Sequence, residues 1–319
     1  MNWHTLAGNR VLGAVVIAIV LQVLSAWLID GYDISTSLRP LLVISAFLAI
    51  ASIGQTLVII LGGIDLSIPF VMGFANVVAA QLYGQGVDFT LICLLVGALA
   101  LLIGAVNGAL SSILKIHPLI ITLGIGTMVQ GSVLWWTGGF PSGSAPDAVS
   151  EFVSIGASLG PIPLPGLIPA VIVLAVAVAL MLSSTAYGRR LYAIGGNPGA
   201  ARYALISPAG MWIATFALSA FFAAMAGILL LGFTGSAYGD VGQPYLFQTI
   251  AAVVIGGTAL VGGRGSYIGT IAGSLVLVEI NTLLIGLGLQ PSMVQAALGA
   301  VIIALVSLYG RESHIRTTI

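Results

Sequence analysis

The sequence contains very little charge. Only 6% of its 319 residues are Asp, Glu, Lys or Arg, 59% are hydrophobic, and the formal net charge is zero. Soluble domains carry about 25% charged residues, so nine basic and nine acidic side chains are too few to cover a soluble surface of this size. The mean hydropathy of +1.16 therefore indicates an integral membrane protein. The scarcity of cations excludes a basic face for nucleic acid.

Cysteine and catalytic motifs are also scarce. The single cysteine, Cys93, excludes an internal disulfide and a Cys-rich metal site. There is no G-x-x-x-x-G-K-[ST] phosphate loop, no H-E-x-x-H and no G-x-G-x-x-G. The histidines, His4, His117 and His314, lie at the termini or at the edge of a predicted span, which disfavours an intramembrane hydrolase. The N-terminus lacks the features of a cleaved signal peptide, so we expect its first apolar segment to remain as a helix.

Apolar segments bounded by charges and prolines make up most of the chain. At about 20 residues per crossing, they predict an all-α polytopic membrane protein with about ten transmembrane helices in one domain, residues 1–319. The segments are residues 11–29, 40–61, 69–82, 89–113, 118–136, 167–183, 208–233, 244–261, 267–287 and 291–309. Several begin near a proline, including Pro40 and Pro244, because a first-turn proline loses no hydrogen bond. Ser207 is a good N-cap for the segment that follows it.

The positive charges predict the orientation of the chain, because cytoplasmic loops retain Lys and Arg. With the N-terminus inside, only Arg39 falls on the outer face. Both termini are then cytoplasmic, the loop of about residues 138–165 is periplasmic, and the polar segment of about residues 185–207 is cytoplasmic. The positive residues on the cytoplasmic face are Arg10, Lys115, Arg189, Arg190, Arg202, Arg264, Arg311 and Arg316.

Two Gly-Gly turns suggest an internal duplication. The segments IILGGIDLSIPFVMG near residue 60 and VVIGGTALVGGRGSYIG near residue 255 both place such a turn after an apolar helix. Helices 2–5 and 7–10 would then form an inverted repeat, a common basis of alternating access. The alternative is coincidence, since Gly-Gly is frequent in a chain with 42 glycines.

Polar residues within the apolar segments are candidates for a translocation path. Amides bind hydroxylated solutes without the desolvation cost of a charge, although hydrogen bonding between helices explains any single one better. For Glu279, a proton or cation site or a substrate contact is the functional hypothesis, and a contact with a neighbouring helix is the favoured alternative. The path candidates are Gln55, Asn76, Asn107, Gln130, Gln248, Glu279 and Asn281. The pairs Gly104–Gly108 and Gly269–Gly273 instead predict close helix packing.

Three stretches together resemble the permease subunit of bacterial ABC importers for sugars, of the ribose, xylose, arabinose and galactofuranose type. They are GGIDLS at residues 62–67, YGRRLYAIGGNPGAAR at 187–202 and VVIGGTALVGGRGSYIGTIAG at 253–273. The likeness covers nearly the whole chain, and the flank NGALSSILKIHPLIITLGIGTMVQG agrees with it. This sequence departs from the usual pattern at Ile68-Pro69, which replaces a more familiar Val-Gly.

The resemblance implies a transporter subunit in the bacterial inner membrane, not an enzyme. It implies a pathway formed by two permeases, two copies or one copy with a related chain, and a sugar delivered by a periplasmic binding protein. ATP and Mg would bind to a separate cytoplasmic ATPase, so we expect no cofactor in this chain. The loop matching residues 187–206 would contact that ATPase. The coupling candidates are Arg189, Arg190, Gly195, Gly196, Asn197, Pro198, Ala200, Ala201 and Arg202.

The residues of this loop fit such a role. Asn197 and Pro198 are an N-cap and a first-turn proline, and they predict a short helix through Gly199 to Leu205. The Gly-rich turns on the same face comprise Gly62, Gly63, Asp65, Ser67, Gly262, Gly263 and Arg264. We expect Asp65 or Ser67 to cap the third helix, with contact to the ATPase as the alternative. The same two interpretations apply to Arg264.

Other functions remain as alternatives. The ABC cargo could instead be a nucleoside, a furanone-like signal molecule or a branched-chain amino acid. A zwitterion needs fixed ionic partners or helix ends directed at it. Glu279 is the one ionisable residue clearly within the predicted spans, so a neutral sugar is favoured as the cargo. A proton-coupled secondary carrier working alone is the less favoured alternative.

Overall fold

The computed structural model describes residues 3–160 and 164–310, and in these ranges the regular structure is almost entirely helical, with an isolated bridge between Ser144 and Ser236. The residues Arg311, His314 and Arg316, and with them the predicted position of the C-terminus, lie outside the described part. The helices are α1 (Trp3–Leu28), α2 (Ile34–Leu61), α3 (Ile68–Gly84), α4 (Phe89–Ile113), α5 (Pro118–Trp136), α6 (Asp147–Val153), α7 (Leu167–Ser184), α8 (Ala186–Gly196), α9 (Pro198–Tyr203), α10 (Pro208–Thr234), α11 (Tyr245–Ile255), α12 (Tyr267–Gly286) and α13 (Pro291–Gly310).

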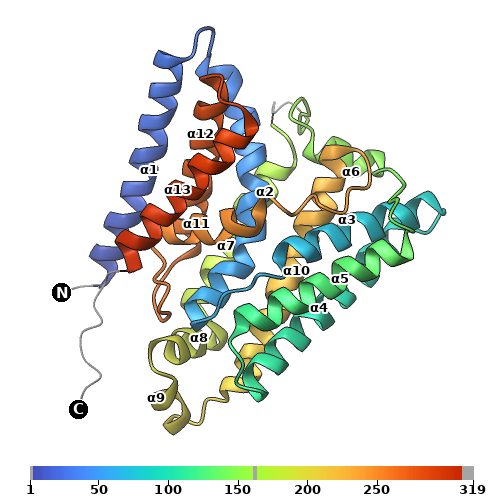
Figure 1. Cartoon of the computed structure of the whole chain (residues 1–319). Helices are drawn as coiled ribbons and strands as arrows, with labels where there is room; N and C mark the ends of the chain where they lie inside the picture. Colours follow the sequence, from blue (N-terminus) through green and yellow to red (C-terminus); the bar gives the residue numbers. More distant parts are fainter. Residues whose placement is uncertain (1–2, 161–163, 311–319) are drawn as a thin grey trace.

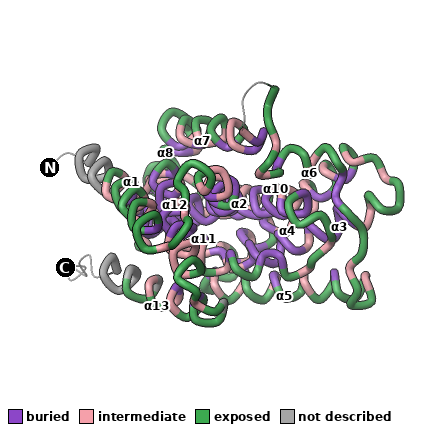
Figure 2. The backbone as a smooth tube through the Cα atoms, turned by 90° about the horizontal axis from the view of Figure 1, so that it is seen from above, coloured by how far each residue is buried: buried purple, intermediate pink, exposed green. Residues whose placement is uncertain are grey.

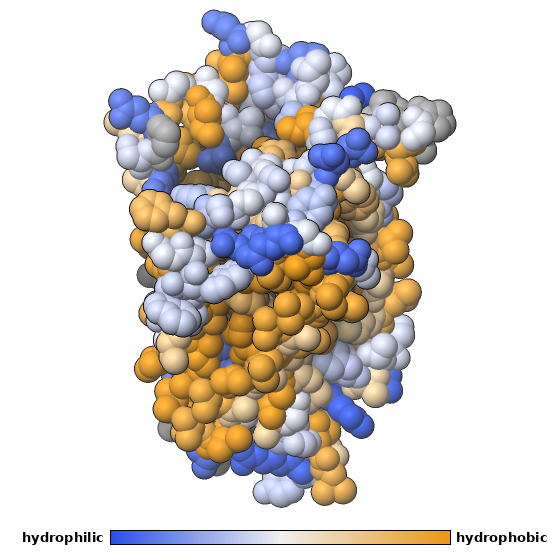
Figure 3. All heavy atoms as spheres, turned by 90° about the vertical axis from the view of Figure 1, so that its right-hand side faces the viewer, coloured by the Kyte–Doolittle hydropathy of each residue, from blue (hydrophilic) through white to orange (hydrophobic). Residues whose placement is uncertain are grey.

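The arrangement of apolar helices is that of a polytopic membrane protein. Within the described residues, seven helices are long and apolar enough to cross a bilayer, namely α1, α2, α4, α5, α7, α10 and α12. The apolar helices α3 and α11 are shorter, with 17 and 11 residues. Figure 3 shows apolar side chains over the middle of one face and hydrophilic ones towards its two ends. In Figure 1 the short helix α6 lies at one end of the bundle and α8 and α9 lie at the other.

Two predicted helix boundaries are wrong. The second helix begins at Ile34, before Pro40, because the Asp33 side chain accepts hydrogen bonds from the backbone N–H of Ser35 at 3.2 Å and from its hydroxyl at 2.6 Å. Pro40 therefore lies inside α2 rather than at its first residue. The segment predicted over residues 244–261 is helical only from Tyr245 to Ile255, since the backbone at Gly257 turns to a φ of +87°.

Other local predictions are confirmed or extended. The Ser207 side chain accepts a hydrogen bond from the backbone N–H of Gly210 at 3.3 Å and so caps α10 as predicted. Helix α6 within the long loop and helix α8 within the polar segment were not predicted, because both are short and only weakly apolar. Pro69 lies in the first turn of α3, where its missing N–H is tolerated.

Helices α2 and α10 form the centre of the bundle. Figure 2 shows both largely buried, whereas α1, α5 and α13 lie further out and expose one side. Helix α10 packs against α3 and α4, and α2 packs against α11 and α12. Helix α10 therefore contacts the two helices that follow α2 in the chain, and α2 contacts the two helices that follow α10. The two Gly-Gly turns do not occupy equivalent places in this pattern, because one ends α2 and the other ends α11.

Glycines allow the closest contacts between these helices. Gly104 and Gly108 of α4 lie directly against the backbone of α10, and Gly269 and Gly273 of α12 lie against that of α11. A Cβ atom at any of these positions would collide with a carbonyl oxygen of the neighbouring helix. The predicted packing role of both pairs is confirmed.

Candidate functional site

The three stretches that carry the resemblance meet at one point near the α8–α9 end. Glycines from the end of α2, the end of α8 and the turn before α12 are in mutual van der Waals contact. We call this contact the glycine junction, and its members are Gly62, Gly195, Gly196, Gly262 and Gly263. Residues far apart in the sequence are thereby joined through their backbones, without intervening side chains.

Two features of the glycine junction require glycine. A Cβ atom on Gly195 would collide with the carbonyl oxygen of Ile60, and one on Gly263 would approach the Cα of Gly196 to 2.6 Å. Gly263 also has a φ of +72°, which side-chain-bearing residues rarely adopt. At this position its N–H donates a 2.8 Å hydrogen bond to the Ile60 carbonyl oxygen. The close approach thus joins α2 directly to the turn before α12.

Helix α8 is fixed to the bundle by two tyrosines. The hydroxyl of Tyr192 donates a 2.8 Å hydrogen bond to the carbonyl oxygen of Gly265, next to the glycine junction. The hydroxyl of Tyr187 is 3.0 Å from that of Thr215 on α10. Burial raises the pKa of Tyr187 to about 12, so this hydroxyl keeps its proton. A displacement of α8 would therefore act on α2, on α10 and on the turn before α12 together.

Helix α9 projects from this end of the molecule. The Asn197 side chain accepts a 3.0 Å hydrogen bond from the backbone N–H of Ala200, which confirms the predicted cap and short helix. Ala201 is buried, whereas Pro198, Ala200 and Arg202 are exposed. Arg190 is also exposed, and Arg189 donates a 3.1 Å hydrogen bond to the carbonyl oxygen of Ser184.

Two exposed apolar side chains at the end of α9 were missed by the sequence analysis. Tyr203 is 94% exposed and Leu205 is 95% exposed. Leu205 has a φ of +58°, a strained conformation for a residue with a Cβ atom. The structure therefore holds an exposed leucine in a conformation that glycine adopts more easily. The sequence signal that could have identified them is the presence of an aromatic and an aliphatic residue within the most polar segment of the chain.

Asp65, in the segment between α2 and α3, is the centre of a second cluster of polar residues. Its carboxylate is 1% exposed and accepts hydrogen bonds from the Ser67 N–H at 2.8 Å, the Ser67 hydroxyl at 2.6 Å and the Ser219 hydroxyl at 2.7 Å. Asn107 donates to the Ser67 hydroxyl at 2.9 Å, and the N–H of Leu66 donates to Thr122 at 3.0 Å. This Asp65 network connects the segment to α4, α5 and α10.

The prediction that Asp65 or Ser67 caps α3 through its side chain is wrong. Ser67 occupies the N-cap position but makes no side-chain capping bond, and Asp65 instead accepts the hydrogen bond from its N–H. The burial of Asp65 leaves it no surface for a partner protein in this conformation. Gly63 is also buried. Arg264 is exposed in the turn before α12, where its carbonyl oxygen accepts a 3.0 Å hydrogen bond from Ala259.

Three path candidates lie inside the bundle. Asn76 accepts a 2.8 Å hydrogen bond from the N–H of Tyr238 and donates one of 3.4 Å to the carbonyl oxygen of Gly227. Asn107 belongs to the Asp65 network. Gln55 is fully buried, and neither atom of its amide has a partner.

The remaining path candidates are dispersed. Gln130 on α5 donates a 2.8 Å hydrogen bond to Asp240, which is exposed. Gln248 and Asn281 are half-buried, and Glu279 is fully buried between helices. A cavity of about 430 Å³ between α4, α6 and α10 is lined by apolar side chains and contains none of the candidates. The structure does not bring the seven residues into one cavity.

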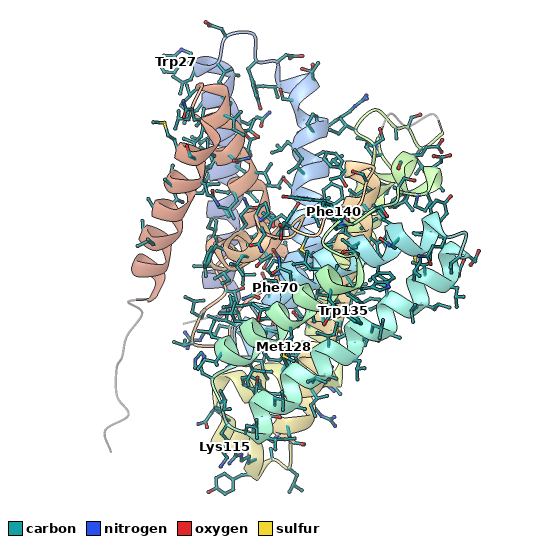
Figure 4. The ribbon with its side chains drawn as sticks, turned by 45° about the vertical axis from the view of Figure 1, so that its right-hand side comes forward. Trp27, Phe70, Lys115, Met128, Trp135 and Phe140 are labelled. Carbon is teal, nitrogen blue, oxygen red and sulfur yellow. The ribbon has the colours of Figure 1, made fainter. Side chains whose placement is uncertain are left out.

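The outer face of α5 combines exposed apolar residues with the polar pair Gln130–Asp240. Met128 is 71% exposed and Trp135 is 86% exposed. Figure 4 shows both, with Phe140 beyond the helix, on the side of α5 that faces away from the bundle, while Lys115 lies at the α8–α9 end. The opposite side of α5 packs on α3, where Gly126 leaves room for the Phe70 ring.

Comparison with known proteins identifies the family. The family model described as "Branched-chain amino acid transport system / permease component" matches residues 37–306. The chain is 32% identical over 303 residues to the ribose import permease protein RbsC of Bacillus subtilis (strain 168), covering 94% of this chain and 91% of the relative. It is 35% identical over 269 residues to RbsC of Escherichia coli (strain K12), covering 83% of each chain.

A further relative carries a different name. The fructose import permease protein FrcC of Rhizobium meliloti is 32% identical over 302 residues, covering 92% of this chain and 83% of the relative. No solved structure matches the chain at a significant level. These are membrane subunits of transport systems, not enzymes. The chain belongs to this family of transport-system permease components.

Proposed function

We propose that this chain is the membrane subunit of an ATP-binding-cassette importer that carries a small neutral sugar into the bacterial cytoplasm. The names of the relatives, ribose and fructose import permeases, support this cargo. The glycine junction is the observation that carries the proposal, because it connects the segment expected to contact an ATPase to α2. The Tyr187–Thr215 contact connects the same segment to α10, the other central helix.

The energy would come from a separate ATPase docked at the α8–α9 end. The exposed side chains of Tyr203 and Leu205, with Arg202 beside them, offer an apolar centre and a positive charge for such a partner. Tyr and Arg side chains are typical anchors of protein interfaces. Movement of α9 would reach the transmembrane helices through α8, Tyr187 and Tyr192. ATP and Mg would be bound by that partner.

The proposal includes ten crossings of the inner membrane with both termini in the cytoplasm. The short helices α3 and α11 each follow a non-helical segment, residues 62–67 and 235–244, and would cross together with it. Reciprocal packing of α10 on α3 and α4, and of α2 on α11 and α12, supports an inverted repeat of helices 2–5 and 7–10. The α6 end would then face the periplasm and receive a sugar-binding protein.

A second permease copy would complete the pathway. The face of α5 with Met128 and Trp135 is apolar enough for an interface, and the pair Gln130–Asp240 adds polar groups at its edge. A polar pair is costly if it faces lipid. It is suited to a path for a hydroxylated solute between two copies.

Reconstitution tests this function. The tagged chain would be purified from its membrane with the subunits that accompany it, and the complex placed in liposomes with labelled ribose, fructose and leucine. We expect sugar uptake that requires ATP and the binding protein, with no uptake by the chain alone. Uptake by the chain alone under a pH gradient would refute the ABC function, and ATP-dependent uptake of leucine without sugar uptake would refute the cargo.

A further inference from the structure

A second group of polar residues lies between α1 and α12, away from the coupling segments. The two helices run side by side in the same direction (Figure 1), and a Cβ atom on Gly286 would collide with the side chain of Ile29. Glu279 lies seven residues before Gly286 on α12, and Gln22 lies seven residues before Ile29, which directly follows α1, so each is two helical turns away on the same face. Ser25 lies between Gln22 and Ile29 on that face. This spacing places Gln22, Ser25 and Glu279 on the sides of α1 and α12 that are in contact.

These side chains are buried without partners. Glu279 is 0% exposed, and neither carboxylate oxygen has a hydrogen-bond partner. Both polar atoms of the Gln22 amide and the hydroxyl of Ser25 are also buried and unpartnered. Leaving an unpaired charge in such surroundings costs several kcal/mol. A ligand with one positive charge would satisfy the buried carboxylate and could accept the neighbouring amide and hydroxyl oxygens as further partners.

Tyr32, in the loop between α1 and α2, closes this cluster towards the end of the bundle. Burial first, and then the nearby charge of Glu279, raise the pKa of Tyr32. From α11, the contacts of that helix with α12 bring Tyr245 to about the same level. The exposed Asp30 and Asp33, and the half-buried Arg39, lie nearer the end of the bundle.

We propose that Glu279, Gln22 and Ser25 form a site for one small monovalent cation between α1 and α12, closed by Tyr32. One carboxylate balances one positive charge, and the amide and hydroxyl oxygens are hard ligands suited to sodium or a proton. No group of three His, Cys, Asp or Glu side chains that could hold a metal ion occurs among the described residues, which argues against a divalent metal. The bound cation ties the outer helix α1 to the bundle.

Thermal unfolding of the full chain in nanodiscs tests this site without any transport assay. Sodium chloride is titrated against choline chloride at constant ionic strength, at two pH values. We expect the Tm to rise by about 2–5 °C and saturate with sodium, and Glu279→Gln to abolish the rise. A rise on acidification that needs no sodium, and that Glu279→Gln also abolishes, identifies the cation as a proton.

Further variants keep the test decisive if Glu279→Gln does not fold. Ser25→Ala and Gln22→Leu retain the carboxylate and should shift the midpoint of the titration at least tenfold. Asp33→Asn removes an exposed carboxylate from the same end and should leave the response unchanged. A wild-type Tm that responds to neither sodium nor pH, or a response retained in Glu279→Gln, overturns the proposal. Neither result bears on sugar import.

Discussion

The backbone N–H of Gly263 donates a 2.8 Å hydrogen bond to the carbonyl oxygen of Ile60. This bond ties the turn before α12 to the last turn of α2, at the place where α8 also arrives. A backbone-to-backbone contact transmits displacement better than flexible side chains, because protein interiors are close-packed. Substitutions that place a Cβ atom between the touching backbones of the glycine junction should therefore act on coupling.

Gly195→Ala should reduce ATP-driven uptake at least tenfold. The new Cβ atom would collide with the Ile60 carbonyl and push α8 away from α2. Gly196→Ala is the matched control, because the space around its Cβ position is open to at least 4 Å. Uptake is measured in proteoliposomes at equal protein content. Equal activity of the two variants would show that the contact does not matter for coupling.

Asp65→Ala should destabilise the protein by about 3 kcal/mol or more. Three hydrogen bonds to the carboxylate would be lost, and bonds to charged groups contribute about 1.5–3 kcal/mol each. The exposed Asp88 caps α4 through a single 3.1 Å hydrogen bond to Leu91, so Asp88→Ala should cost only about 1 kcal/mol. The free energies of unfolding of the two variants are compared by chemical denaturation in detergent. A similar loss in both variants would contradict the importance of the network.

Leu205→Gly should have opposite effects on stability and on partner binding. Glycine relieves the strain of a φ of +58°, which stabilises the turn by about 1 kcal/mol. Removal of a side chain that is 95% exposed should at the same time weaken binding of the ATPase at least tenfold. Thermal unfolding and affinity for the purified ATPase report the two effects. Undiminished affinity would exclude Leu205 from the interface.

Gly104→Ala should destabilise the bundle by about 2 kcal/mol or more, because its Cβ atom would meet the backbone of α10. Gly131→Ala on α5 provides the control, since no atom lies within 4 Å of its Cβ position. Unfolding free energies of the two variants, measured in the same detergent, separate packing from the general effect of replacing a helical glycine. A difference below about 0.5 kcal/mol would contradict the close packing.

Local features were predictable because they depend on neighbouring residues. Asn197 caps α9 and Ser207 caps α10, as their positions before a proline indicated. Pro40 misled the prediction of α2, because the capping bonds of Asp33 start the helix earlier and a proline can be accommodated inside it. The end of α11 was misjudged because apolarity continues past the turn at Gly257.

By itself, the sequence determined that this protein lies in a membrane and resembles a transport permease, since both follow from composition and from motifs read along the chain. Only the tertiary structure decided which polar residues serve together. It joined Asp65 to Ser219 and left the buried carboxylate of Glu279 without a hydrogen-bond partner. Hydrogen bonding and steric exclusion act between residues that are close in space, and one sequence read alone does not record which residues the packing of helices brings together.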